Sequence, residues 1–247
     1  MSPVLLSTQQ VLSLRHSTSW TLLAMSAGAV NAGAFIACER FVTHVTGTVT
    51  QLGVDTGMME LTFESLTLLV AFILGAMASV FAIQGRVARG RRALHALPLF
   101  AVTGLLMVAS VGGHLGVFGP MGGTETGFAL LCVLAFAMGL QNASVSSSTG
   151  SLVRTTHLTG PATDLGVHLS MAWVSNSAKE RKQMARLAAL RAIKLAAFGL
   201  GAMIMVPITR QLGYLAFSLP AVMVLAATVN TFLPSLHEED HDTVGAH

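Results

Sequence analysis

The sequence predicts an all-α polytopic membrane protein whose helices form two related halves. The chain of 247 residues is 53% hydrophobic and has a mean hydropathy of +0.68. Only 10% of its residues are charged, against about 25% in a soluble domain, which is too little to cover a water-facing surface. A thirteen-residue segment rich in threonine and glycine also occurs twice, at 43–55 and 156–168.

The helices follow from the apolar stretches that are long enough to cross the hydrocarbon core, which takes about 20 helical residues. We expect six transmembrane helices, near 19–37, 65–84, 97–118, 127–147, 189–209 and 213–233. The first stretch follows Arg15 and ends in small residues, as a signal peptide does. Its Asn-Ala pair returns in mid-chain at Asn142, where no signal peptide can lie. We therefore interpret the first stretch as a helix that stays in the membrane.

The Lys and Arg residues predict the orientation of these helices. Basic clusters lie at 86–92 and 154–194, between the second and third stretches and between the fourth and fifth. With a cytoplasmic N-terminus, both clusters and Arg15 face the cytoplasm, which accounts for 12 of the 14 Lys and Arg residues and follows the positive-inside rule. Arg40 and Arg210 are the two basic residues expected on the opposite side of the membrane from the cytoplasm. We expect a multi-pass membrane protein with both termini in the cytoplasm.

The repeated segment reads THVTGTVTQLGVD in the first half and THLTGPATDLGVH in the second, with eight of thirteen positions identical. If both segments crossed the membrane, the two basic clusters would face opposite sides. We therefore expect each segment to be re-entrant or broken, or to be a short helix packed inside the protein. Each half then has an odd number of crossings, and the halves are expected to be inverted repeats.

This arrangement predicts four regions along the chain. Residues 1–17 are a cytoplasmic N-terminal segment, 18–120 the first three-helix repeat and 121–233 the second. Residues 234–247 are expected to be a disordered acidic tail, because they carry polar residues and no apolar stretch.

Amide side chains within the apolar stretches are the first candidate solute-binding residues. Asn31 and Asn142 are related by an offset of 111, and Gln141 shares the environment of Asn142. A buried amide costs free energy unless it is paired. The partner is either a solute or ion, or another helix across the axis between the halves, where such a bond contributes about 1 kcal/mol.

Thr46-Gly47 and Thr159-Gly160 are the next candidates. Each pair is typical of a break followed by a helix start, because threonine can cap a helix and glycine permits close backbone approach. A helix that begins there presents unpaired N–H groups and the positive end of its dipole to an anion. The alternative is a cap and a tight turn without a ligand.

His44 and His157 are the only ionisable residues that the two repeats share. Histidine changes its charge near physiological pH, so a pair near the membrane centre could carry a coupled proton. The alternative is a neutral imidazole that ties each repeated segment to a neighbouring helix.

Two repeat positions differ in charge between the halves, because Gln51 is matched by Asp164 and Asp55 by His168. These four residues are secondary candidates, because a directional binding site needs different polar residues on a symmetric scaffold. The alternative is sequence drift after duplication, which would leave the same pattern. Metal-ligating side chains do not converge at a recognisable spacing. We expect no metal, no cofactor and no catalytic residue.

The remaining features predict packing and lipid contact. Small residues such as Gly28 and Gly75 suit close helix crossing, and Cys38 and Cys132 are interpreted as packing residues. The stretch 179–194 is amphipathic and basic, which predicts an interfacial helix attracted to anionic lipid before the fifth span.

The segments AGAVNAGAF, FVTHVTGTVTQLG and FAMGLQNASVSSSTGSLVRTTHLTG closely resemble the YoaK family of small bacterial membrane proteins, a domain of unknown function. The resemblance spans residues 20–233. Members of this family usually have Asp at the position of Asn31 and Asn at the position of Thr48. The resemblance therefore implies a polar site at these positions, with a different charge in this chain. It implies the fold class, a location in the bacterial cytoplasmic (inner) membrane and no established activity.

These observations favour a secondary transporter or permease of a small polar solute, with an anion as one candidate, whose site lies between the inverted repeats near the membrane midplane. Two other classes remain open: a membrane enzyme with His44 or His157 as general base on a lipid-soluble substrate, and a non-transporting scaffold subunit. The expected partners are the lipid bilayer and a small-molecule solute, with a homo-oligomer left open. The basic residues lie in short runs between apolar stretches, so we expect no nucleic acid.

Overall fold

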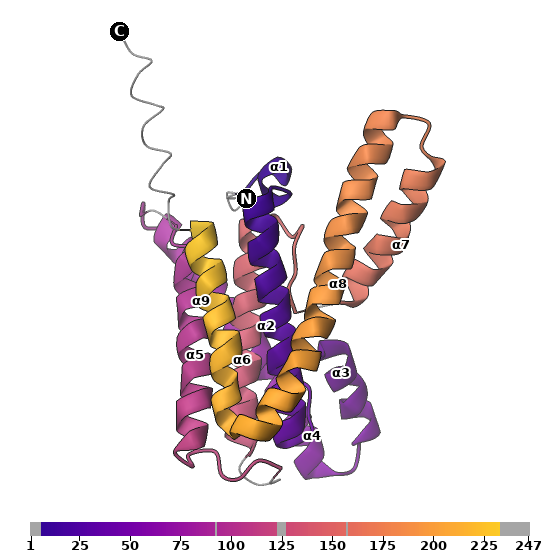
Figure 1. Ribbon diagram of the computed structural model, residues 1–247. Helices are drawn as coiled ribbons and strands as arrows, with labels where there is room; N and C mark the ends of the chain where they lie inside the picture. Colours follow the sequence, from indigo (N-terminus) through magenta and orange to yellow (C-terminus); the bar gives the residue numbers. More distant parts are fainter. Residues whose placement is uncertain (1–5, 92, 123–126, 157, 233–247) are drawn as a thin grey trace.

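The computed structural model describes residues 6–91, 93–122, 127–156 and 158–232 (Figure 1). The described residues form helices and connecting loops with no strand among them, so the predicted all-α class is confirmed. The predicted acidic tail 234–247 lies outside this part of the chain.

The helices follow one another in an order that places two similar sets of elements along the chain. In sequence they are α1 (Thr8–Val11), α2 (Leu14–Cys38), α3 (Val45–Val54), α4 (Met59–Val87), α5 (Ala96–His114), α6 (Gly127–Ser148), α7 (Thr159–Val174), α8 (Ala178–Leu212), the 3-10 helix η1 (Gly213–Phe217) and α9 (Ser218–Phe232).

Five helical runs of the described chain are long and apolar enough to cross a membrane. Four are α2, α4, α5 and α6, and the fifth is the continuous run Ala178–Phe232, which contains α8, η1 and α9. Their number indicates a multi-pass membrane protein. With 15 residues, α9 is about 22 Å long, which is short of the hydrocarbon core of about 30 Å. A separate sixth crossing therefore stays a prediction.

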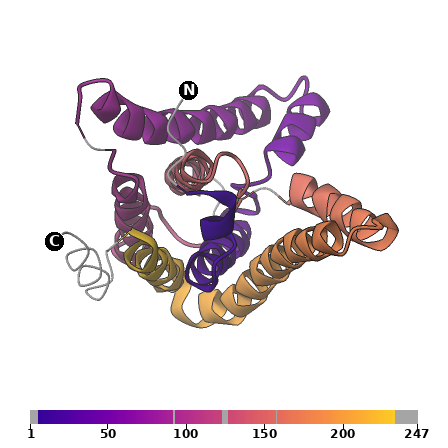
Figure 2. The ribbon, with the colours of Figure 1, turned by 90° about the horizontal axis from the view of Figure 1, so that it is seen from above.

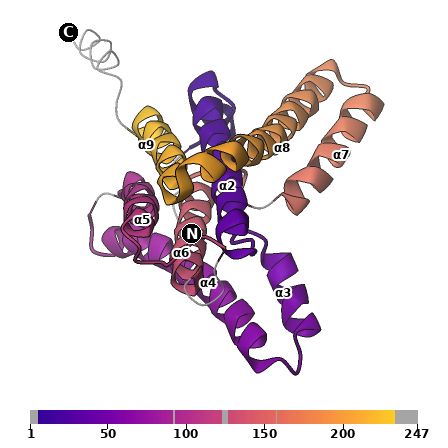
Figure 3. The ribbon, with the colours of Figure 1, turned by 60° about the horizontal axis from the view of Figure 1, so that its bottom comes forward.

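The helices are arranged as an upright group flanked by two oblique helices. Figure 2 shows α2, α5, α6 and α9 nearly end-on, with α4 and α8 running obliquely along two sides of them. α4 packs against α6, and α8 packs against α2. Figure 3 shows the two short helices beside the first parts of these oblique helices, α3 next to α4 and α7 next to α8.

Backbone hydrogen bonds at both ends of α2 show that it runs antiparallel to α6. The N–H of Leu6, just before α2, donates to the carbonyl of Ser148 at the end of α6 over 3.1 Å. At the other end, the N–H of Gly122, which precedes α6, donates to the carbonyl of Ala37 over 2.8 Å. The end of each helix therefore lies beside the start of the other.

The pair α5 and α9 is antiparallel as well. The hydroxyl of Ser110, near the end of α5, donates to the carbonyl of Leu215 just before α9 over 3.3 Å. At the opposite end, the ring of His95 stacks on Phe232 with a centroid distance of 6.4 Å. Together with α2 and α6, these helices form a tightly paired group in which neighbours alternate in direction.

The start of α2 and the end of α9 are joined by hydrogen bonds at one end of the bundle. Arg15 in α2 donates through Nε to the carbonyl of Asn230 in α9 over 2.6 Å. Asn230 donates back through Nδ2 to the carbonyl of Arg15 over 2.9 Å and to the hydroxyl of Ser19 over 2.8 Å. The start of α2 and the end of α9 therefore lie at the same end of the molecule.

Glycines bring α2 and α8 into backbone contact. A Cβ atom added to Gly28 would lie 2.0 Å from the carbonyl oxygen of Phe198, and one added to Gly201 would lie 2.0 Å from that of Met25. Such small residues allow helices in a membrane to approach closely and to form Cα–H···O contacts. The packing role predicted for Gly28 is confirmed.

The same contact occurs between α6 and α4. A Cβ atom on Gly139 would lie 2.0 Å from the carbonyl oxygen of Phe72, and one on Gly75 would lie 2.0 Å from that of Phe136. Gly139 follows Gly28 by 111 positions, the offset that also relates the two asparagines. The contact of α2 with α8 thus has a counterpart, helix for helix and glycine for glycine, in the contact of α6 with α4.

The basic stretch 179–194 does not form a helix of its own. It is the first part of α8, which continues without interruption from Ala178 to Leu212. The hydroxyl of Ser177 caps this helix by accepting the N–H of Glu180 over 3.4 Å. The stretch is helical as predicted and leads directly into the apolar part of α8, because it contains no residue that stops a helix. Its place at the membrane interface stays a prediction.

Candidate functional site

In the first half, the chain turns back along α2 before the repeated segment begins. The side-chain oxygen of Asn31 accepts the N–H groups of Val42 and Thr43, both at 3.1 Å. Asn31 lies seven positions before the end of α2 at Cys38, which is about 10 Å along the helix axis. The repeated segment therefore starts beside the body of α2, and the oxygen of Asn31 is used to hold it there.

In the second half, the chain turns back along α6 in the same way. The Nε2 of Gln141 donates to the hydroxyl of Thr155 over 3.2 Å and to the carbonyl of Leu23 in α2 over 3.1 Å. Gln141 is fully buried, and its Oε1 has no hydrogen-bond partner in the described chain. The Oδ1 of Asn142 is buried without a partner as well. The candidate His157 lies outside the described residues.

Short helices begin at both repeated segments, as the Thr-Gly pairs predicted. α7 starts at Thr159, and α3 starts at Val45, one residue before Thr46. The threonines do not cap these helices, because the N-cap positions are His44 and Leu158 and neither forms a side-chain cap bond. Both helix starts therefore retain backbone N–H groups that no side chain caps.

The two helices lie on the same side of the bundle, on the right in Figures 1 and 2, with α3 towards one end and α7 towards the other. α3 has no buried residue, and Pro161 is the one residue of α7 found to be buried. The alternative of short helices packed inside the protein is therefore wrong for the single chain. Each forms the outer arm of a helical hairpin, α3 with α4 and α7 with α8.

A cavity of about 230 Å³ lies between α3 and the helices beside it. His44, Gly47 and Gln51 line it from the repeated segment, and Ser65 and Leu68 line it from α4. The ring of His44 lies over Gly47, where an added Cβ atom would lie 2.5 Å from Nδ1. Glycine is therefore needed for the histidine to hold this position in the cavity wall.

A buried carboxylate stands next to this cavity. Gln51 donates through Nε2 to Oδ1 of Asp55 over 2.7 Å. Asp55 is only 2% exposed, and its Oδ2 has no hydrogen-bond partner in the described part of the chain. At the equivalent position of the second half, the Nδ1 of His168 is also buried without a partner. Both positions therefore keep a polar atom that the described chain does not satisfy.

A second cavity, of about 250 Å³, lies at the corresponding place in the second half. Gly160 and Asp164 line it from the repeated segment, and Arg191 lines it from α8. Gly160 matches Gly47 and Asp164 matches Gln51, each at an offset of 113. The structure thus brings the glycine of each Thr-Gly pair and the first charge-asymmetric position of each half to the wall of a separate cavity, whereas Thr46 and Thr159 line neither cavity.

Two cations of α8 beside the second cavity are new to the candidate site. Arg191 pairs with Asp164 at 3.1 Å and also donates to the carbonyl of Leu152. Lys194 is 1% exposed, and its Nζ has no partner among the described residues. Both residues were assigned to the cytoplasmic basic cluster, although their spacing of three places them on one helix face within an apolar run.

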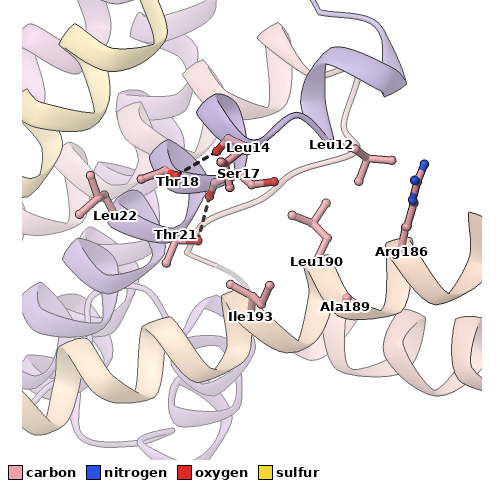
Figure 4. A pocket seen from close by; sticks show the side chains of 10 residues that line it. All are labelled: Leu12, Leu14, Ser17, Thr18, Thr21, Leu22, Arg186, Ala189, Leu190 and Ile193. Carbon is pink, nitrogen blue, oxygen red and sulfur yellow. Dashed lines mark hydrogen bonds between the residues drawn. The ribbon is translucent and has the colours of Figure 1, made fainter.

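A larger cavity lies elsewhere, between the first turns of α2 and the first part of α8 (Figure 4). It is about 810 Å³ and is lined mainly by aliphatic side chains, with Arg186 at one side. Its two threonines, Thr18 and Thr21, already donate to carbonyls one turn earlier in α2, over 2.9 and 2.8 Å. Because neither repeated segment lines this groove, we do not take it as the solute site.

The described residues contain no group of three or more His, Cys, Asp or Glu side chains that could hold a metal ion. The polar side chains that line the two cavities are an amide, hydroxyls, a carboxylate in each cavity and basic groups. They can form hydrogen bonds and ion pairs with a small solute.

The family model described as "Protein of unknown function (DUF1275)" matches residues 20–230. The chain belongs to this family. The DUF1275 match covers both repeated segments and both cavities, so the candidate site lies within the family domain. Comparison with curated proteins and with solved structures gave no match. Any assignment of function to this DUF1275 member therefore has to come from the geometry of the chain.

Proposed function

We propose that the protein is a permease or secondary transporter of a small polar solute in the bacterial cytoplasmic membrane. Its site lies near the membrane midplane between two inverted three-helix repeats, residues 18–120 and 121–233. In this proposal α9 is the sixth crossing and both termini face the cytoplasm. The DUF1275 match is compatible with the YoaK family, to which we also assign the chain.

The paired helix contacts support the inverted repeat. α2 and α6 correspond in sequence and run antiparallel. α5 and α9, each the last helix of its half, run antiparallel as well. The contact of α2 with α8 corresponds to that of α6 with α4, with the same close approach at glycine. Many transporters are built from such inverted repeats with discontinuous segments at the substrate site.

The observation that carries the proposal is the pair of cavities at equivalent positions. One repeated segment lines each cavity. Asn31 in the first half and Gln141 in the second hold the start of that segment beside the preceding span. Alternating access needs a site that can open to either side, and two equivalent cavities on inverted halves provide its two faces. Neither a catalytic triad nor a metal centre is needed to explain this arrangement.

The candidate residues take distinct roles in this proposal. Asn142 and Gln141 offer unpaired amide oxygens to the solute, and Asn31 positions the first repeated segment. The uncapped starts of α3 and α7 supply backbone N–H groups. We assign proton coupling to His44 and His157, because imidazole changes charge near physiological pH.

The test is solute entry into proteoliposomes that contain the purified protein. Vesicles are shrunk by stopped-flow mixing with potassium phosphate, sulfate, nitrate or acetate in the presence of valinomycin, or with glycine, and light scattering follows reswelling. We expect at least one solute to enter faster than in protein-free vesicles. Rates equal to those of protein-free vesicles for every solute would contradict the proposal.

Two alanine variants of the same helix provide the matched control. Gly47→Ala places a Cβ atom 2.5 Å from the His44 ring and should slow solute entry. Gly53→Ala changes the same helix at a position with nothing within 4 Å and should leave entry unchanged. Equal rates of solute entry for the two variants would show that transport does not depend on the first cavity.

A further inference from the structure

The two cavities differ in one respect that bears on the class of solute. The close approaches of the glycines align α4 with α8 at an offset of 126, which matches Gly75 with Gly201. At the same offset, Ser65 and Leu68 of the first half are matched by Arg191 and Lys194 of the second. The same scaffold position is therefore neutral in one half and doubly cationic in the other.

Lys194 is the more unusual of the two cations. It lies within α8, is 1% exposed, and its Nζ has no hydrogen-bond or ion-pair partner among the described residues. An unpaired ammonium group away from water costs several kcal/mol, so buried lysines in membrane proteins face a counter-ion or a functional pathway. Asp164 is the carboxylate that acts electrostatically on Lys194, and it already forms an ion pair with Arg191.

The charges around the second cavity do not balance. Asp164 is the one carboxylate that lines it, and it is already paired with Arg191 at 3.1 Å. Arg154 also lines the cavity, and the Nε of Arg191 is buried without a partner among the described residues. Lys194 lies one turn further along α8 than Arg191, so three cations and one carboxylate lie at or next to this cavity. The uncapped start of α7 at Thr159 adds the positive end of a helix dipole.

We propose that the second cavity binds a small oxyanion, a carboxylate, phosphate or sulfate group, whose charge is neutralised by Lys194 and Arg191. Guanidinium and ammonium donors with backbone N–H groups are the usual receptors of such groups. Asp164 holds Arg191 in place and is half exposed on the outer arm of the hairpin. The inference rests on the proposed function for the passage of the anion, whereas binding itself is independent of transport.

The experiment measures thermal unfolding of the purified full-length protein in detergent. Potassium phosphate, sulfate and acetate are titrated against potassium chloride of equal ionic strength. We expect at least one oxyanion to raise the unfolding midpoint saturably above the chloride value, because a ligand that binds the folded state stabilises it. No such rise with any oxyanion, or an equal rise with chloride, would overturn the proposal.

Three variants assign the effect to Lys194. Lys194→Leu installs the residue found at the equivalent position of the first half, removes the unpaired charge, and should raise the midpoint without oxyanion while abolishing the oxyanion response. Lys194→Arg should retain the response. Lys182→Gln, at an exposed position of the same helix, should leave it unchanged. A response of Lys194→Leu equal to that of the unaltered protein would overturn the assignment.

Two further arms separate this inference from its alternatives. If phosphatidylglycerol in mixed micelles stabilises the protein and no free oxyanion does, the cations bind a lipid headgroup and the solute inference fails. If an oxyanion binds but does not enter proteoliposomes, the binding site stands and the transporter proposal fails. If glycine enters proteoliposomes and no oxyanion raises the unfolding midpoint, the transporter proposal stands and the anion inference fails.

Discussion

The backbone contact between α4 and α6 allows a sharp prediction for Gly139→Ala. The added Cβ atom would lie 2.0 Å from the carbonyl oxygen of Phe72. A carbon and an oxygen in favourable contact are about 3.3–3.6 Å apart, so the two helices must separate by more than about 1 Å at this point. Overpacking of this kind destabilises a protein by about 1–3 kcal/mol, and the contacting atom is backbone, which cannot rotate away.

The assay is unfolding of the purified protein in mixed micelles, with Gly104→Ala as the control. Gly104 lies within α5 with nothing within 4 Å of an added Cβ, so its substitution gains about 0.5–1 kcal/mol from helix propensity alone. Gly28→Ala, which meets the carbonyl of Phe198 at the same distance, should destabilise as much as Gly139→Ala. If Gly139→Ala were as stable as Gly104→Ala, the close approach of α4 and α6 would be refuted.

Two further predictions concern the stability of the fold. Asn31→Leu leaves two backbone N–H groups without their acceptor and should cost about 1–3 kcal/mol, whereas Asn31→Asp keeps the acceptor oxygens and should cost less; equal unfolding midpoints for the two variants would argue against this role. Burial lowers the pKa of His95, so the unfolded chain binds this proton more readily than the folded one, and stability should fall as pH drops below about 6.5. His95→Gln should reduce this loss, and an identical pH dependence of the unfolding midpoint would contradict it.

Much of the fold could be predicted from composition and repetition. The apolar stretches located the long helices because about 20 apolar residues have few other stable arrangements in lipid. The Thr-Gly pairs located the starts of α3 and α7 to within one residue, because a polar break followed by an apolar run is a local signal. Gly28 and Gly75 were identified as packing residues because small residues within apolar helices suit close helix crossing.

The cationic part of the candidate site could not be predicted in the same way. Arg191 and Lys194 lie at the end of the amphipathic basic stretch 179–194, and basic side chains in such a stretch normally extend to the membrane surface. The burial of Arg191 depends on the loop that returns along α6 and on α7, which are contacts between distant parts of the chain. The role of Asn31 was likewise undetermined, because its partners Val42 and Thr43 become neighbours only when the chain turns back.

The inverted relation of the halves is the central claim, and the two hairpin loops test it most directly. Thr56, after α3, and Asn176, after α7, are both exposed. Each is replaced by cysteine in a chain whose Cys38 and Cys132 are changed to alanine, and a membrane-impermeant maleimide is added to sealed vesicles of known orientation. Inverted repeats predict that Thr56→Cys and Asn176→Cys are labelled from opposite sides of the membrane. Labelling of both from the same side would contradict the account.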